Sequence, residues 1–244
     1  MALLGDEDRG FLENHLAQAL VDPVRLVFFT QQMACQFCRE TEQVLSEVAS
    51  LSEKIGLEVL DFVDDADEAA RLSVDKIPAT AVLAHSTDGD GDYGVRFYGL
   101  PSGYEFSSLI EAIVDVSRGD ADVSGASRRA LSELDRHVHV QVFVTPTCPY
   151  CPPAVRAAHS LALVSPLVRA DMVESIEFPQ LAIKYGVQGV PRTVINEGTR
   201  LEGAMPEPLL VAHVMYAAGQ LDEQALQAIR AQYRSNDDDE GGDA

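Results

Sequence analysis

The chain has 244 residues, which exceeds a typical domain of about 150 and allows one large domain or two small ones. Hydrophobic residues make up 46% of the chain, which excludes a wholly disordered protein. The 39 acidic and 18 basic residues give a formal net charge of −21, and such a surface repels phosphate backbones and anionic lipids. Neither a nucleic acid nor a membrane surface is therefore expected as a partner.

The first residues show no signal for export. Residues 1–8 lack both a basic region and a long apolar region, and the strongest apolar run, Leu26–Phe29, is far too short to cross a bilayer. We therefore expect a cytoplasmic protein. In a reducing cytoplasm, four cysteines are more often catalytic or metal-binding than structural.

The cysteines form two pairs whose first members lie 113 residues apart, close to half the chain. A proline follows the first cysteine of each pair by 43 residues, in a similar context: Leu72-Ser-Val-Asp-Lys-Ile-Pro78 and Tyr185-Gly-Val-Gln-Gly-Val-Pro191. The motifs themselves are Cys35-Gln-Phe-Cys38 and Cys148-Pro-Tyr-Cys151. Matched motifs at a matched spacing predict an internal repeat.

Apolar periodicity predicts the same order of elements in both halves. The first half should form a helix over 11–20, a strand over 25–30, a helix from Cys35 to Leu51, a strand over 57–63, a short helix over 67–72, strands over 80–84 and 94–98, and a helix over 106–114. The second should form a helix over 126–135, a strand over 138–144, a helix from Cys148, a strand over 172–176, a helix over 179–185, a hairpin of 192–196 and 200–202, and helices between 207 and 233.

This order predicts an α/β protein of two tandem units, each a central mixed sheet flanked by helices, packed through an apolar interface. The expected boundaries are 1–118 for the first unit and 119–234 for the second, with a linker around 117–125. Residues 235–244 are rich in Asp and Gly and are expected to be a disordered acidic tail.

Each cysteine pair is expected at a strand-to-helix junction, with the first cysteine at the helix start and the second one turn further on. The free N–H groups and dipole of a helix start stabilise a thiolate, so the first cysteine should be the nucleophile and the second should resolve the mixed disulfide. Pro149 suits the first helical position, because a proline lacks the N–H that would be unpaired there. The pair Cys35–Cys38 has no such proline, so its motif is the less standard of the two.

A strand, a CxxC motif at a helix start and a proline before a hairpin resemble the thioredoxin fold, and Cys-Pro-Tyr-Cys resembles the glutaredoxin motif. Two such units, with Thr145-Pro-Thr-Cys-Pro-Tyr-Cys-Pro152 and Phe97-Tyr-Gly-Leu-Pro101, resemble the archaeal-type protein disulfide oxidoreductases, also called glutaredoxin-like proteins. The resemblance covers residues 1 to about 220 and implies two tandem thioredoxin-like units. It also implies that the catalytic residues are Cys148, Cys151, Cys35 and Cys38.

The resemblance further implies that Ile77–Pro78 and Val190–Pro191 are cis bonds beside the sulfur atoms, whose backbone binds an extended segment of the substrate. No cofactor or metal is needed for the exchange, and electrons would come from a thioredoxin-reductase-like flavoprotein. The chain departs from thioredoxin in having no Trp. The position of the buried thioredoxin carboxylate would fall at Phe29 and Val142, so the sequence names no proton acceptor.

Other interpretations of the cysteines stay open. A four-cysteine zinc site usually brings its pairs within about 20 residues, and a cluster bridging two chains would absorb visible light. The first pair could be inactive in redox exchange. His137 and His139 have strand spacing, but such residues are more often surface or core than metal ligands.

Two functions therefore compete. The first is a thiol–disulfide oxidoreductase that reduces, forms or isomerises protein disulfides. The alternative is a redox-relay module that delivers electrons to one partner such as a peroxidase. The direction of electron flow depends on relative thiolate stability, which the four motif letters do not determine.

The charge composition predicts a response to salt. Only three of the 18 basic residues are lysines, which together with the charge of −21 points to a salty cytoplasm, although an ordinary acidic protein has the same composition. Salt screens repulsion between carboxylates, with a Debye length of about 3 Å at 1 M, so the melting temperature should rise from low to molar salt. A melting temperature that stays constant across this range would contradict adaptation to high salt.

Overall fold

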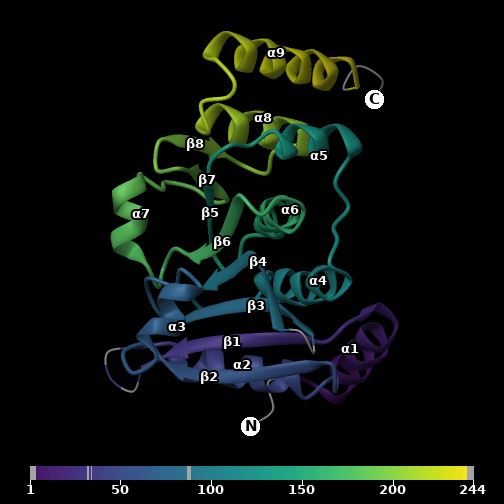
Figure 1. The fold of residues 1–244 in the computed structure, drawn as a ribbon, viewed down its shortest axis with the longest axis vertical. Coiled ribbons are helices and arrows are strands. Elements are labelled where there is room, and N and C mark those ends of the chain that lie inside the picture. Colours follow the sequence, from purple (N-terminus) through teal and green to yellow (C-terminus); the bar gives the residue numbers. More distant parts are fainter. Residues whose placement is uncertain (1–3, 32, 34, 87–88, 241–244) are drawn as a thin grey trace.

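The computed structural model describes residues 4–31, 33, 35–86 and 89–240 of the chain (Figure 1). Within these residues the first half contains α1 (Asp6–Ala19), β1 (Val24–Thr30), α2 (Cys38–Ala49), β2 (Ile55–Asp61), α3 (Ala66–Arg71), β3 (Ala79–Ser86), β4 (Gly89–Tyr98) and α4 (Glu105–Arg118). The second half contains α5 (Gly125–Ser132), β5 (Val138–Val144), α6 (Cys151–Val164), β6 (Val168–Glu174), α7 (Pro179–Tyr185), β7 (Arg192–Ile195), β8 (Thr199–Glu202), α8 (Glu207–Ala217) and α9 (Glu223–Glu240).

The strand order shows the repeat directly. In the first half β1 pairs with β2 in parallel and with β3 antiparallel, and in the second half β5 pairs with β6 in parallel and with β7 antiparallel. Each half then ends in an antiparallel hairpin, β3–β4 and β7–β8. The prediction of two α/β units with a mixed sheet in each is therefore confirmed.

The way in which the two units join differs from the expectation. Instead of two separate sheets in apolar contact, β4 pairs with β6 in parallel, from Val95 opposite Ala170 to Tyr98 opposite Val173. The result is one sheet in the order β2-β1-β3-β4-β6-β5-β7-β8. Without this pairing, the backbone N–H and C=O groups of two long edge strands would be unpaired, so joining the edges satisfies both. The unit boundary near residue 118 remains a prediction.

Helices cover both faces of the sheet. The larger core lies between one face and α1, α2, α4, α5, α6 and α8, and the smaller core lies under α3 and α7 on the other face (Figure 1). Strand residues alternate between these cores: Val140, Val142 and Val144 face the larger one, and Phe143 faces the smaller one. Burial on both faces explains why the central strands are almost continuously apolar.

Charged residues lie on both strands of the join, on the face of the smaller core, where Arg96 is opposite Asp171. The guanidinium of Arg96, from β4, donates two hydrogen bonds to the carbonyl oxygen of Leu72, at 2.8 and 3.0 Å. On β6, Asp171 is fully buried and lies 2.5 Å from Nε2 of His139. Burial alone would raise the pKa of Asp171, but His139 and Arg169 outweigh burial and hold that pKa below its usual value. His139 is thus part of an ion-pair cluster.

The C-terminal segment differs from its prediction. Residues 235–240 continue α9 instead of forming a disordered tail, and residues 241–244 lie outside the described part of the chain. The reason lies in the sequence, because the first glycine after α9 begins is Gly241 and no proline interrupts the helix. Among the described residues, no helix has the length and apolar character needed to cross a membrane.

Candidate active sites

Both cysteine pairs lie at the same edge of the sheet. The strands β1, β4, β6 and β5 all run in one direction, so their carboxyl ends meet at the edge to which the β1 arrow points in Figure 1. Cys35 follows β1, and Cys148 follows β5. In each pair the two cysteines are joined as a disulfide, Cys35–Cys38 and Cys148–Cys151.

The helices begin three residues later than the sequence predicted. The second cysteine of each pair opens the helix, since α2 starts at Cys38 and α6 starts at Cys151. Pro149 is therefore not in the helix, and the prolines of its first turn follow Cys151. The cause is a turn in the motif itself, in which the N–H of Cys151 donates to the carbonyl of Cys148 at 3.4 Å. The first cysteine thus lies ahead of the helix start.

Exposure distinguishes the two cysteines of each pair. Cys148 is 8% exposed and Cys151 is completely buried. Likewise, Cys35 is half-buried and Cys38 is buried. A nucleophile must be reached by a partner, whereas a resolving cysteine needs to reach only its neighbour. The first cysteine of each pair is therefore the one that an incoming disulfide can meet.

Each unit has a proline loop near the end of its first strand. Ile77–Pro78 and Val190–Pro191 are cis, as expected. The carbonyl oxygen of Val190 lies 3.7 Å from Sγ of Cys148. In the first half, Pro78 leads into Ala79, which is opposite Phe29 near the end of β1. Both prolines are thus at the edge that carries the cysteines.

The loop after β4 reaches across to the second site. The N–H of Tyr104 donates to the carbonyl oxygen of Pro146 at 2.9 Å, two residues before Cys148. Gly103 has a φ of 59°, and a Cβ there would clash with the same oxygen. Only glycine tolerates both this φ and this close approach. The first half therefore shapes the loop that carries the second nucleophile.

A buried carboxylate lies beside this loop. Glu105 opens α4, is 1% exposed, and accepts a hydrogen bond of 2.6 Å from the hydroxyl of Ser108. Its Oε1 atom has no hydrogen-bond partner among the described residues. Burial raises the pKa of Glu105 to about 7. The helices α4 and α6 follow β4 and β5, whose carboxyl ends lie at the edge where the disulfides are, and the two helices pack against each other.

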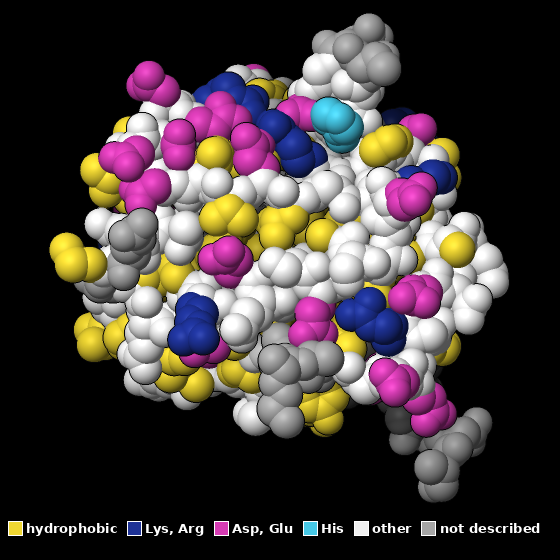
Figure 2. All heavy atoms as spheres, turned by 90° about the horizontal axis from the view of Figure 1, so that it is seen from below, with side chains coloured by type: hydrophobic (Ala, Val, Ile, Leu, Met, Phe, Trp, Pro, Cys, Tyr) yellow, Lys and Arg dark blue, Asp and Glu magenta, His cyan; other side chains and the backbone are white. Residues whose placement is uncertain are grey.

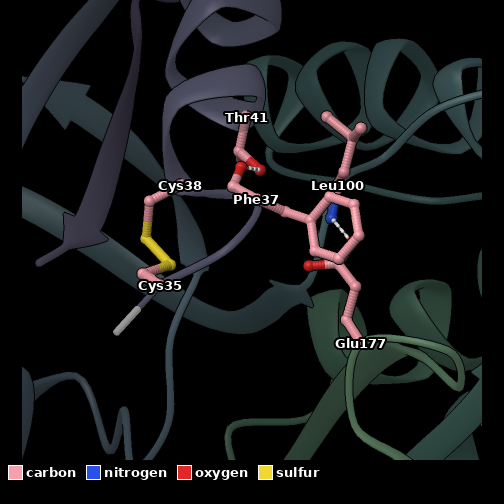
Figure 3. Close-up of a disulfide and its surroundings, with 6 residues drawn as sticks. All are labelled: Cys35, Phe37, Cys38, Thr41, Leu100 and Glu177. Atoms are coloured by element: carbon pink, nitrogen blue, oxygen red, sulfur yellow. Dashed lines mark hydrogen bonds between the residues drawn. A yellow bond between two sulfur atoms is a disulfide. The ribbon is translucent and has the colours of Figure 1, made fainter. Parts of the chain in front are cut away.

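Two further glutamates lie at the end of β6, and one of them, Glu177, lies in the surroundings of the first site. Glu174 ends β6 and is 3% exposed, and Glu177 follows it in the loop before α7. In Figure 3, the side chain of Phe37 extends from the first disulfide toward Leu100 and Glu177. The N–H and the hydroxyl of Thr41 both donate to the carbonyl of Phe37, at 2.9 and 2.8 Å, and fix this turn.

None of these three glutamates was predicted from the sequence. The position expected for a buried carboxylate, six residues before each first cysteine, holds Phe29 and Val142, which are indeed buried and apolar. The sequence could have shown that Glu105 is buried, because Glu105 stands four residues before Leu109 and so lies on the same buried face of the helix. The partners of Glu174 and Glu177 lie in the other half of the chain, so no local pattern shows them.

Large apolar side chains are exposed at the edge of the sheet that carries the cysteines. Large exposed hydrophobic side chains follow the carboxyl ends of five strands: Met33, Val63, Tyr104, Tyr150 and Ile176. Figure 2 views the end of the molecule formed by β2 and α2, where acidic and hydrophobic side chains are intermixed. Exposed apolar side chains around a reactive disulfide are typical of a surface that binds other proteins.

Comparison with known proteins agrees with this geometry. The family model of the thioredoxin domain (Thioredoxin_3) matches residues 138–215. A protein disulfide oxidoreductase from Aeropyrum pernix K1 superposes with a TM-score of 0.80 at 30% identity, covering 89% of this chain and 95% of that one. A mutant of the alkylhydroperoxide reductase AhpF from Enterococcus faecalis (V583) gives a TM-score of 0.79 at 26% identity, covering 86% of this chain and 99% of that one.

Curated relatives are longer than this chain. An NADH dehydrogenase of Ferdinandcohnia aciditolerans is 24% identical over 173 residues, which are 70% of this chain and 33% of that protein. The chain thus spans about a third of the length of such relatives. The two superposed structures have tandem thioredoxin-like units, which is the fold class that the sequence predicted.

The raised pKa of Glu105 predicts a pH-dependent stability. Its pKa is about 7 in the folded chain against an ordinary 4.5, so the folded state binds the extra proton and loses stability as pH rises through this range. Between about pH 5 and about pH 8, the contribution of Glu105 to the free energy of unfolding falls by up to about 3 kcal/mol. Glu105→Gln keeps an acceptor for Ser108 and does not titrate. The variant should therefore show a smaller slope of the free energy of unfolding against pH.

Urea denaturation of the oxidised protein at both pH values measures the effect. The matched control is Glu111→Gln on the same helix, where the half-buried carboxylate faces Arg156 at 3.1 Å, and this variant should keep the wild-type slope. Equal slopes in the wild type and Glu105→Gln would show that Glu105 does not retain a proton near neutral pH.

Proposed function

The chain belongs to the protein disulfide oxidoreductase family of tandem thioredoxin-like units, and we propose that both of its cysteine pairs act on protein disulfides. Its reaction is thiol–disulfide exchange. The observation that supports two active pairs is that each disulfide lies at one sheet edge, with a more accessible first cysteine and a proline loop at the same edge. We place the activity in the cytoplasm, with a thioredoxin-reductase-like flavoprotein as electron source.

At the second site, we assign the first step of the exchange to Cys148 and the second step to Cys151. The thiolate of Cys148 attacks one sulfur of a substrate disulfide, and the other substrate sulfur leaves as a thiolate that takes a proton from solvent. The thiol of Cys151 loses its proton, and the resulting thiolate attacks Cys148. This step forms Cys148–Cys151 and expels the second substrate sulfur as a thiolate, which takes a proton from solvent. Glu105, buried at the start of α4 against α6, is the group that we assign to accept the Cys151 proton.

Substrate binding is assigned to the two proline loops. The carbonyl of Val190 beside Cys148 supports a backbone hydrogen bond to an extended substrate segment, as in strand addition. Pro191 is buried and holds this loop, whereas Val190 is half-buried. Ile77 and Pro78 have the same pattern of burial and take the same role at the first site.

The two sites act separately. Four strand spacings of about 4.8 Å separate β1 from β5, so the two cysteine loops start about 19 Å apart. A disulfide bond forms only between Cα atoms that are within about 7 Å of each other. Electrons therefore pass between the pairs only through a third thiol compound or a substrate protein.

Trapping tests the assigned order of the cysteines. With Cys35 and Cys38 both replaced by Ser, Cys151→Ser should stop the reaction after the first step and leave a substrate protein bound to Cys148. Cys148→Ser should give no such adduct, because Cys151 is fully buried. Intact mass after mixing with a disulfide-containing protein and quenching in acid measures both.

The opposite pattern, with an adduct in Cys148→Ser alone, would reverse the two roles. A zinc or cluster site would behave differently from either order. Loss of either cysteine would then release metal, and neither variant would form a covalent adduct.

A second candidate function is a relay to a dedicated partner such as a peroxidase. It is favoured by the likeness to the alkylhydroperoxide reductase AhpF over 86% of this chain. Turnover of insulin disulfides with dithiothreitol separates the two functions. A general oxidoreductase should reduce insulin, with a larger loss in Cys148→Ser than in Cys35→Ser. A protein that leaves insulin unreduced but passes electrons to a peroxidase would support the relay.

A further inference from the structure

Glu174 and Glu177 belong to the second half of the chain but touch the first half. Oε1 of Glu177 accepts a hydrogen bond of 2.7 Å from the N–H of Leu100, in the loop after β4. A Cβ added at Gly99 would lie 2.6 Å from Cβ of Glu174 and 3.0 Å from Oε1 of Glu177. The two side chains thus fill the space where β4 and β6 end side by side.

Both carboxylates have an oxygen without a partner. Glu174 is 3% exposed, and its Oε2 accepts a hydrogen bond of 2.7 Å from the N–H of Glu177. Oε1 of Glu174 and Oε2 of Glu177 are buried and have no hydrogen-bond partner among the described residues. Two charged carboxylates with buried, unpaired oxygens are unfavourable, so this arrangement favours a state in which a proton is retained.

The charges that face Glu177 come from two elements. Burial is the main cause that raises the pKa of Glu177 to about 7, and the carboxylates of Glu174 on β6 and Glu40 on α2 raise it further. Glu40 stands two residues after Cys38, and Phe37 extends from the same motif toward Glu177 (Figure 3). Glu177 therefore interacts with a charge on the helix that Cys38 opens, and it lies in the surroundings of the first disulfide that Figure 3 draws.

We propose that Glu177, supplied by the second unit, is a positioning residue that sets the thiolate stability of the Cys35–Cys38 pair in the first unit. The inference rests on the proposed function, in which this pair is an active dithiol. When a thiol of the reduced pair loses its proton, Glu177 gains one through solvent, so the local charge is unchanged. When the sulfur atoms form a disulfide again, Glu177 returns its proton to solvent, and no electron passes through the carboxylate.

The physical consequence is a coupling between two titrations. A charged Glu177 opposes a nearby thiolate, and a thiolate in turn favours the protonated carboxyl. Removal of the charge therefore makes the thiolates of the first pair form at lower pH. The carboxylate also caps Leu100, so the test must separate its charge from its hydrogen bond.

Glu177→Gln makes that separation, because glutamine keeps an acceptor for Leu100 but does not titrate. The background is the full chain with Cys148 and Cys151 replaced by Ser, so that only the first pair reacts. The pH dependence of the alkylation of Cys35 by iodoacetamide gives the midpoint of thiolate formation. We expect Glu177→Gln to lower this midpoint by about one pH unit relative to the same background.

The matched control is Glu53→Gln, an exposed glutamate in the loop after the far end of α2, which should leave the midpoint unchanged. Glu177→Leu removes both charge and acceptor. If Glu177 acts only as a cap for Leu100, Glu177→Gln will behave as the background does, and Glu177→Leu alone will lose stability. That result would overturn the proposal.

If the Glu177 variants do not fold, the protonation of Glu177 can be followed in protein that keeps this residue. In the same background near neutral pH, difference infrared spectra between reduced and oxidised protein should show a protonated carboxyl band that grows on reduction. A spectrum without this band would overturn the proposal. Failure of the proposed function is a separate result, because the thiolate midpoint of Cys35 is measured without a protein substrate.

Discussion

Parallel pairing of β4 with β6 determines where the functional groups of this protein lie. It gives β1 and β5 the same direction, and both cysteine pairs consequently face the same edge of one sheet. It also inserts the loops after β4 and β6 between the two disulfides. Two units in contact through separate sheets would have no such fixed relation, because side-chain packing between faces does not fix the direction of their strands.

The same pairing gives each unit an influence on the site of the other. The loop after β4 binds the carbonyl of Pro146, which shapes the approach to Cys148. In return, Glu174 and Glu177 extend from the second unit to Gly99 and Leu100. Burial at this boundary raises the pKa of Glu177, so a group that would be ionised in water retains a proton near neutral pH.

Most of the architecture of each unit could be predicted from the sequence, because it depends on local patterns. The strand over 138–144 and the helix over 179–185 coincide with β5 and α7, since apolar periodicity and flanking prolines or glycines mark their ends. The cis bonds before Pro78 and Pro191 also agree with the resemblance drawn from the matched spacing. The assignment of the four cysteines as catalytic stays a prediction, which the trapping experiment tests for Cys148 and Cys151 and the insulin assay tests for Cys35.

What the sequence did not predict depends on contacts between distant residues. No local pattern in Val95–Tyr98 shows that this strand pairs with Ala170–Val173. The residues of both segments would suit a strand at the edge of a sheet as well as one in its middle. The buried glutamates were missed for the same reason. The helix starts at Cys38 and Cys151 were predicted three residues early, because the turn between the cysteines resembles a first helical turn in its residues.

The join between the units has one further consequence for assembly. It connects the fourth strand of one unit to the second strand of the next, which is a head-to-tail contact, and such contacts extend into filaments unless something ends them. β8 occupies the place in the second unit that β4 has in the first, but it has only four residues, two of them the charged Arg200 and Glu202. The part of β4 that pairs with β6 also has four residues, Val95–Tyr98, but its one charged residue, Arg96, is buried. Arg200 and Glu202 are exposed instead, and exposed charges on an edge strand oppose pairing with a second molecule, which protects the repeat from further addition.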